Sequence, residues 1–328
     1  MTRGPDTGTY AAFAGAILIG GANFIAVSIS NRELPPLWGA TLRFATAGAL
    51  FLALARLRRV PLARGREALG AALYGVLGFG AAYAFLYYAL VELSAGTAAV
   101  ILAAVPLITL LLAAVFGQER LSVRGLVGGA LAVGGIAVLS LDSIEADIPP
   151  RYLVASVLGT IAVAASSVIA RSLRAVHPLN MNAIGMVAGT VVLIAGSLLL
   201  GEPRPMPERA ATWVAFGWLV TLGSVGLFQL FLHVLQRWTA SATVYALTGM
   251  PVVAVALGTI FLDEPVTLEV VAGGALVIGA VYVGAISRER THPAPLPECP
   301  EPEAVDEAGG RRHGRGEDDG EALHSPHA

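Results

Sequence analysis

The sequence predicts an all-α integral membrane protein with ten transmembrane helices, arranged as two inverted five-helix repeats. Three observations support this fold class. Of the 328 residues, 55% are hydrophobic and only 13% are charged, and the mean hydropathy is +0.71. Segments of about 20 apolar residues, the length that crosses a hydrocarbon core of about 30 Å as a helix, recur along the chain. In addition, one long stretch of sequence occurs twice.

The apolar segments contain few or no charged residues, and each is long enough to be a transmembrane helix. They span residues 10–30, 36–55, 68–91, 95–116, 122–141, 152–170, 180–200, 211–235, 240–261 and 267–286. The first segment is expected to be retained rather than cleaved as a signal peptide. The reason is that only Arg3 supplies a basic residue before it, and further apolar segments follow it instead of a secreted domain.

The arginines of the loops predict the orientation. The loop between the second and third segments carries Arg56, Arg58, Arg59, Arg64 and Arg66. An excess of basic residues marks cytoplasmic loops, so this loop is expected inside. Because successive helices alternate in direction, both termini are then expected in the cytoplasm. The expected location is the plasma or inner membrane of the cell.

The repeated stretch relates residues 95–140 to residues 240–285. The offset is 251 − 106 = 145, which aligns Pro106 with Pro251. An offset of 145 residues spans five of the predicted helices, so each repeat contains five. Because five is odd, the second copy must enter the membrane in the opposite direction to the first. Inverted repeats are typical of secondary transporters, in which the two halves rock about a site near the midplane.

These patterns divide the chain into four regions. Residues 1–9 form a cytoplasmic N-terminus, residues 10–141 the first repeat, residues 152–286 the second, inverted repeat, and residues 287–328 a cytoplasmic tail. The tail is rich in Pro, Glu, Asp and Gly and has no apolar periodicity, so it is expected to be disordered. It contains the single cysteine, Cys299, and no disulfide framework is expected.

Several motifs accompany the repeat. The first helix contains GGANFIAVSIS, the second begins with PPLWGATLRF, and the two copies share the blocks FGQERLSVRGLVGGALAVGG and FLDEPVTLEVVAGGALVIGA. Together these motifs resemble the EamA-type branch of the drug/metabolite transporter superfamily, and the resemblance covers residues 10–286. It implies ten helices, an inverted repeat and the transport of small metabolites, often the export of amino acids.

The first and second segments each contain one conspicuous polar residue. Arg43 lies about 10 Å along the second segment at about 1.5 Å per residue, where a guanidinium facing lipid would cost a few kcal/mol. It is therefore expected to face a cavity and to bind a substrate carboxylate. The alternative is a structural cation that snorkels outward or caps carbonyls of a neighbouring helix. Asn23 in the first segment could contact substrate or join two helices.

The third and eighth segments are equivalent in the repeat, and both carry polar stripes. On the eighth, Gln229 and His233 are four residues apart and share a face. His233 is the only histidine within a segment, so it is the candidate for a proton-linked switch, unless it makes an interhelical hydrogen bond. On the third, Tyr83, Tyr87 and Tyr88 could stack on a substrate or pack in the core.

The remaining signals concern helix breaks and helix ends. Pro106 and Pro251 lie in the middle of the fourth and ninth segments, where they are expected to act as hinges or, alternatively, as static kinks. Ser122 and Thr267 are expected to be the N-caps of the fifth and tenth helices. Glu119 and Glu264 just precede these two caps, and both are expected to bind loop amides rather than an ion.

We expect a secondary transporter that exports or exchanges small metabolites such as amino acids by alternating access. No Asp or Glu lies deep in a segment, which disfavours a carboxylate proton relay. The alternatives are an intramembrane enzyme, although no polar constellation for one occurs in the segments, and a membrane scaffold whose tail recruits partners. The expected partners are a small-molecule substrate and the lipid bilayer, and a homodimer is left open. No enzyme activity, nucleic acid, metal ion or cofactor is expected.

Overall fold

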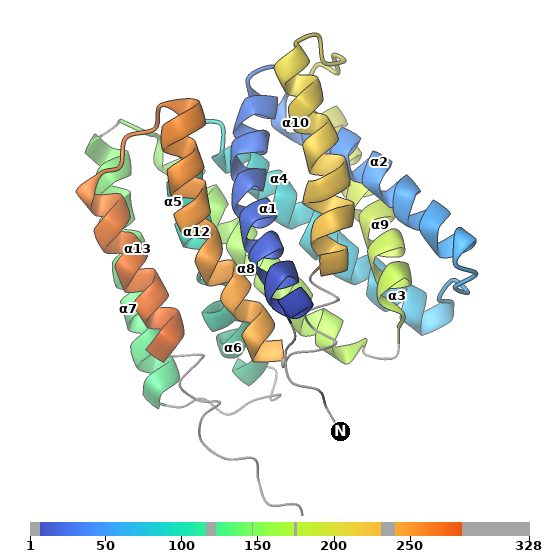
Figure 1. The fold of residues 1–328 in the computed structure, drawn as a ribbon, viewed down its shortest axis with the longest axis horizontal. Coiled ribbons are helices and arrows are strands. Elements are labelled where there is room, and N and C mark those ends of the chain that lie inside the picture. Colours follow the sequence, from blue (N-terminus) through green and yellow to red (C-terminus); the bar gives the residue numbers. More distant parts are fainter. Residues whose placement is uncertain (1–6, 116–122, 146, 174–175, 231–239, 284–328) are drawn as a thin grey trace, which may run out of the picture. The chain divides into compact units, whose positions relative to one another are not determined.

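The computed structural model describes residues 7–115, 123–145, 147–173, 176–230 and 240–283. Within these ranges every regular element is a helix (Figure 1), which confirms the all-helical fold class. Seven helical runs there are long and apolar enough to cross a membrane, and three shorter apolar helices fall on the predicted fifth, ninth and tenth segments. The length and composition of these helices are those of a multi-pass membrane protein, while the number of ten crossings remains a prediction.

The helices follow the predicted segments in order. They are α1 (Thr7–Asn31), α2 (Pro36–Leu57), α3 (Gly65–Gly75), η1 (Val76–Ala81), α4 (Ala82–Ala89), α5 (Ala95–Leu102), α6 (Val105–Val115), α7 (Val123–Glu145), α8 (Pro150–Ser172), α9 (Pro178–Leu199), α10 (Ala210–Val220), η2 (Thr221–Gly226), α12 (Ala240–Leu262) and α13 (Leu268–Val281). The third segment is one run of α3, η1 and α4, and the fourth consists of α5 and α6. Helices α2, α8 and α9 each have a proline in the first turn, where its missing N–H leaves no helical bond unmade.

Two short π-helices occupy equivalent positions in the two halves. The sequence offset relates η1 to η2, because 76 + 145 = 221 and 81 + 145 = 226. Helix α1 begins at the lower end of the bundle in Figure 1, whereas the connection from α7 to α8 lies at the upper end. The second half therefore starts from the opposite end to the first, which is consistent with inverted repeats.

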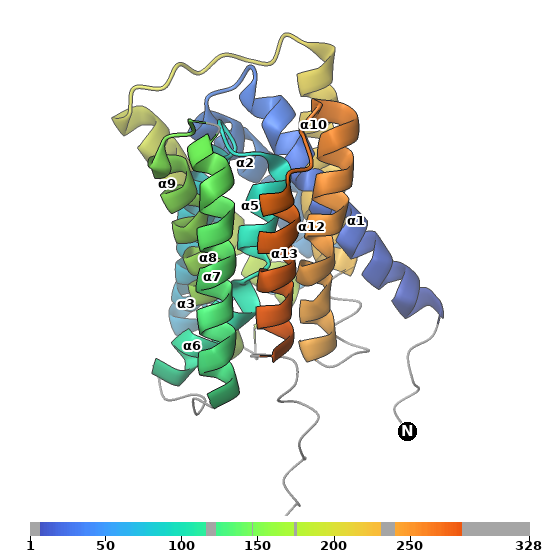
Figure 2. The ribbon, with the colours of Figure 1, turned by 90° about the vertical axis from the view of Figure 1, so that its left-hand side faces the viewer.

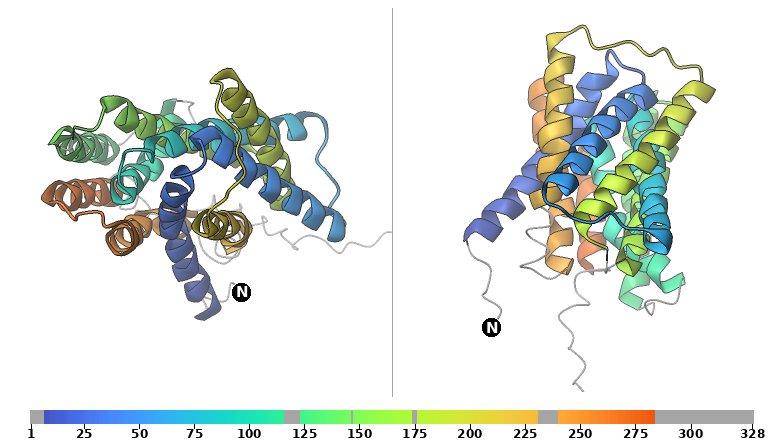
Figure 3. Two further views of the ribbon diagram at one scale, coloured as in Figure 1. Left: turned by 90° about the horizontal axis from the view of Figure 1, so that it is seen from above. Right: turned by 90° about the vertical axis from the view of Figure 1, so that its right-hand side faces the viewer.

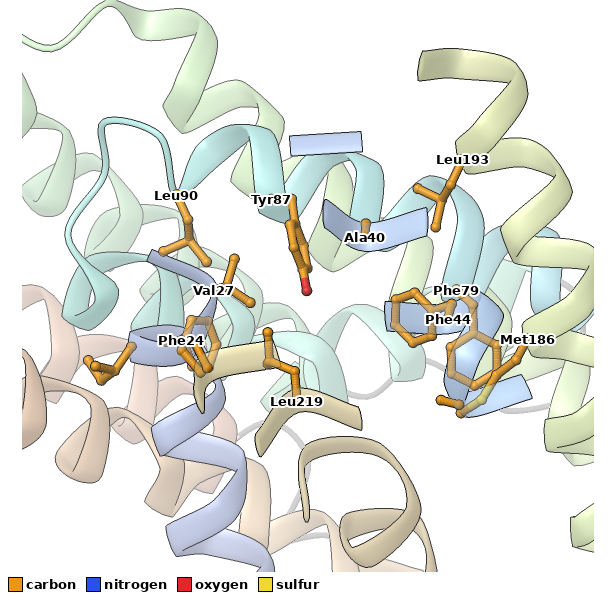
Figure 4. Packing of buried hydrophobic residues seen from close by; sticks show 14 of the residues in the cluster. Phe24, Val27, Ala40, Phe44, Phe79, Tyr87, Leu90, Met186, Leu193 and Leu219 are labelled. Atoms are coloured by element: carbon orange, nitrogen blue, oxygen red, sulfur yellow. The ribbon is translucent and has the colours of Figure 1, made fainter. Parts of the chain in front are cut away.

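Helices of the two halves pack against one another. Helix α2 packs along α9, and α7 packs along α13, as Figure 2 shows for the second pair. Helix α12 contacts both α1 and α5. The largest cluster of buried apolar residues joins α1, α2, α4, α9 and α10 (Figure 4), and it surrounds the buried polar groups described below.

Carboxylates at the upper end cap helices that lie far away in sequence. Glu264 accepts hydrogen bonds of 2.9 and 3.1 Å from the backbone N–H of Ala95, at the start of α5, which confirms its predicted binding of loop amides. Glu202, in the connection from α9 to α10 that crosses above α2 (Figure 3), accepts from the N–H groups of Leu37 and Trp38 at 3.2 and 3.0 Å. Each carboxylate lies where a helix N-terminus favours negative charge.

The predicted N-caps and hinges have different outcomes. The Thr267 hydroxyl accepts a hydrogen bond from the Val270 N–H and caps α13, as predicted. Ser122 and Glu119 lie outside the described residues. The fourth segment is broken between α5 and α6, and Pro106 lies in the first turn of α6. Its equivalent Pro251 lies inside the continuous helix α12. The two prolines thus sit in different local structures, and their roles as hinges remain predictions.

Candidate functional site

The candidate site is built around Arg43 of α2. Its side chain is only 1% exposed, and it is the only charged residue among the fully buried ones in the described part of the chain. Its hydrogen-bond partners among the described residues are all neutral. The Nε atom donates to Ser224 Oγ at 3.2 Å, Nη2 donates to the Gly223 carbonyl at 3.1 Å, and Nη1 donates to the Tyr87 hydroxyl at 3.5 Å. The guanidinium therefore has hydrogen bonds, but these give it no opposite charge.

The π-helix η2 supplies two of these partners. A π-helical turn replaces the usual bonding between residues four apart by bonding between residues five apart, and such turns are frequent at functional sites. The Gly223 carbonyl accepts from Arg43 and also from Asn23 Nδ2 at 3.1 Å. A Cβ atom on Gly223 would lie 2.3 Å from Asn23 Oδ1. Only glycine therefore allows Asn23 to approach this carbonyl.

Asn23 connects three elements. Its Nδ2 donates to Gly223 of η2, and its Oδ1 accepts from Trp218 Nε1 of α10 at 3.2 Å. Since Asn23 itself belongs to α1, its amide joins α1 to the eighth segment. Asn23 thus joins two helices, which is one of the two alternatives predicted for it. The same contacts hold in place the Gly223 carbonyl that accepts a hydrogen bond from Arg43.

Aromatic rings surround the guanidinium. The Cζ atom of Arg43 lies 5.0 Å from the ring centroid of Phe44 and 5.1 Å from that of Tyr83, within the range of cation–π attraction. The Phe44 ring meets Tyr83 edge-on at 4.5 Å and Phe79 at 5.3 Å. Phe79 in turn meets Phe228 at 5.6 Å. We call Phe44, Phe79, Tyr83 and Phe228 the aromatic wall; Figure 4 shows its buried members Phe44 and Phe79.

The structure brings together only some of the predicted site residues. Those that form the site are Asn23, Arg43, Tyr83 and Tyr87. Tyr88 lies apart, 37% exposed, and its ring stacks on that of Tyr152 at a centroid distance of 4.9 Å. Gln229 follows Phe228 of the aromatic wall and is partly buried. His233 lies outside the described residues, so its proposed switch remains a prediction.

Several residues of the site were not predicted from the sequence. They are Phe44, Phe79, Trp218, Gly223, Ser224 and Phe228. The repeat held a signal for two of them, since 83 + 145 = 228 relates Phe228 to Tyr83 and 78 + 145 = 223 relates Gly223 to Gly78. For the others no signal distinguished a site residue from a core residue. Among the described residues, no cluster of His, Cys, Asp or Glu could hold a metal ion.

Comparison with known proteins gives consistent matches along the chain. The profile of the EamA-like transporter family matches residues 7–141 and again residues 151–285. The "uncharacterized inner membrane transporter YedA" of Escherichia coli K12 is 31% identical over 81% of this chain and 87% of its own length. A "probable amino-acid metabolite efflux pump" of the same strain is 24% identical over 81% of this chain and 91% of its own. A crystal structure with 21% sequence identity shares the fold, with a TM-score of 0.61 over 86% of this chain and 98% of that one.

Proposed function

The chain belongs to the EamA-like transporter family, and from this premise we propose that it is a secondary transporter of small, carboxylate-bearing metabolites. It exports or exchanges them by alternating access, with both termini in the cytoplasm. The observation that carries the proposal is the burial of Arg43 among neutral partners. The efflux-pump name of the E. coli relative supports amino-acid metabolites as one class of candidate.

The chemistry of Arg43 supports a carboxylate as the group that binds. Removing a guanidinium from water costs several kcal/mol, whereas each hydrogen bond to a charged group returns about 1.5–3 kcal/mol. The neutral partners offset part of that cost. A carboxylate can accept two parallel N–H bonds from the planar guanidinium and neutralise its charge, so substrate binding would remove the remaining cost.

The two halves support alternating access. The repeated family match and the equivalent π-helices η1 and η2 indicate two similar units, and the contacts of Arg43 reach from α2 in one unit to η2 in the other. In secondary transporters with inverted repeats, the substrate binds between the halves, and rocking of one half against the other exposes it to each side in turn.

The test is counterflow in proteoliposomes. Protein-containing vesicles loaded with a panel of carboxylates, amino acids included, should accumulate a labelled member of the panel. Arg43→Gln should lower this flux by at least about tenfold, because a lost charged hydrogen bond costs about 1.5–3 kcal/mol.

Arg151→Gln is the matched control, since Arg151 is exposed at the start of α8 and contacts Tyr152 instead of the site. Its flux should stay at the wild-type level. Wild-type flux in a correctly folded Arg43→Gln protein would contradict the role of Arg43. Lack of flux for the whole panel would contradict the transport of carboxylates.

A further inference from the structure

The balance of hydrogen-bond donors and acceptors at the site restricts the charge of the substrate. The Gly223 carbonyl has two lone pairs, and Asn23 Nδ2 and Arg43 Nη2 already donate to it. Asn23 Oδ1 accepts from Trp218, and the Tyr87 hydroxyl accepts from Arg43. A guanidinium has five N–H groups, of which three make hydrogen bonds to the described residues. Among the described residues the guanidinium thus keeps two unused N–H donors, whereas each of these acceptors already receives a hydrogen bond and the Gly223 carbonyl has both lone pairs occupied.

The sequence also lacks an acidic partner for a substrate cation. Within the ten apolar segments the only carboxylate is Glu269, which lies in the first turn of α13. Helix α13 packs against α7, α5 and α12 rather than against α2 or η2. The α-ammonium group of an amino acid bound at Arg43 would therefore have no carboxylate to neutralise it at this depth of the membrane.

The aromatic wall favours a substrate that carries an apolar body next to its carboxylate. Phe44 and Phe79 are fully buried, whereas Tyr83 and Phe228 are partly buried and belong to equivalent positions of the two repeats. Rings of this kind favour an apolar or aromatic group in offset or edge-on contact. They could also attract a cation through their faces, but the faces of Phe44 and Tyr83 already lie against Arg43, whose like charge would repel it.

We infer that the substrate is a monoanion, a carboxylate attached to an apolar body, and that the site selects it over the corresponding zwitterion. This inference rests on the proposed function and deepens it, because the carboxylate still binds Arg43. The difference lies in the second charge. An amino acid would have to bury its ammonium group beside the guanidinium, whereas the deaminated acid brings only the charge that the site lacks.

Three matched compounds test the inference. 3-Phenylpropanoate, phenylalanine and phenethylamine share the phenyl ring and carry net charges of −1, 0 and +1 at neutral pH. Their affinity for the purified wild-type protein is measured by isothermal titration calorimetry, and their flux by counterflow. We expect 3-phenylpropanoate to bind at least about tenfold more tightly than phenylalanine, since one unpaired buried charge separates the two, and phenethylamine to bind most weakly. Acetate, which has the carboxylate without the ring, should bind more weakly than 3-phenylpropanoate.

Two variants assign the preference to the site. In Arg43→Gln the three phenyl compounds should bind with affinities within a few-fold of one another, while Arg151→Gln should keep the wild-type order. Phenylalanine binding as tightly as 3-phenylpropanoate to the wild-type protein would overturn the inference, and so would failure of all three compounds to bind. The proposed function would survive both results if another carboxylate shows counterflow that depends on Arg43. The wild-type comparison needs no variant, so a poorly folding substitution leaves the test intact.

Discussion

At the scale of single residues, the charged groups differ in what surrounds them. In the interior, three neutral acceptors and two aromatic rings surround the Arg43 guanidinium. At the upper end of the bundle, Glu33 and Glu264 both accept hydrogen bonds from backbone N–H groups. Burial raises the pKa of Glu264 despite the bonds from Ala95 and Gly96. The pKa of the more accessible Glu33 is lowered, most by a hydrogen bond with the Thr212 hydroxyl and further by hydrogen bonds from backbone N–H groups.

These two shifts predict pH dependences of opposite sign. Because the pKa of Glu33 is lowered on folding, its contribution to stability is present above the ordinary value of 4.5 and is lost as the pH falls through the folded pKa. The pKa of Glu264 is raised on folding, so its contribution is present below 4.5 and is lost as the pH rises through the folded pKa. The melting temperature of the purified protein in detergent, from pH 3 to pH 7, measures both.

Glutamine variants separate the two carboxylates. Glu33→Gln should lower the melting temperature at pH 7, and this difference from wild type should vanish toward pH 3. For Glu264→Gln, the melting temperature relative to wild type should increase as the pH rises from 4 to 7. A pH-independent difference for either variant would show that the carboxyl group does not change its pKa on folding.

At the scale of elements, close packing depends on small residues where helices meet. Helix α3 approaches α9 so closely that a Cβ atom on Gly75 would lie 2.0 Å from the carbonyl oxygen of Gly185 and 2.2 Å from its Cα. Backbone atoms cannot move aside as the end of a flexible side chain can. Gly75 is directly followed by η1, which contains Phe79 of the aromatic wall, so this close contact lies next to the candidate site in the sequence.

Substituting Gly75 by alanine should therefore destabilise the protein. Alanine gains up to about 1 kcal/mol of helix propensity, but overpacking against a backbone costs about 1–3 kcal/mol or more. The overpacking cost exceeds the gain, and we expect a lower melting temperature. Gly217→Ala in α10 is the matched control, because a Cβ atom there has nothing within 4 Å, and it should leave the melting temperature unchanged or raise it. Equal effects of the two substitutions would refute the close contact.

At the scale of the whole molecule, the helices were predictable because hydrocarbon imposes one length and one composition on every spanning helix. Polar groups are expensive in such segments, and for that reason Asn23 and Arg43 stood out in the sequence. The aromatic wall did not stand out, since a phenylalanine suits lipid, core and site equally well. The π-helical turn at Gly223 was also invisible, because hydropathy does not record which carbonyls a helix leaves free.

The orientation of the whole molecule rests on the arginine-rich loop and on the even number of crossings that the sequence predicts. Loss of a single crossing would put the two termini on opposite sides of the membrane. In Figure 1 the start of α1 and the end of α13 lie at the same end of the bundle, as an even number requires. The positive-inside rule predicts that this end faces the cytoplasm.

The single native cysteine offers a direct measurement of this orientation. Cys299 lies in the C-terminal tail, so a membrane-impermeant maleimide should label it only after the cells are permeabilised. In a Cys299→Ser background, Met206→Cys should be labelled in intact cells, because Met206 is 62% exposed in the connection between α9 and α10 at the opposite end. Labelling of Cys299 in intact cells, with Met206→Cys protected, would reverse the orientation. Labelling of both sites in intact cells would place them on the same side of the membrane, which is incompatible with the three crossings that the sequence predicts between them.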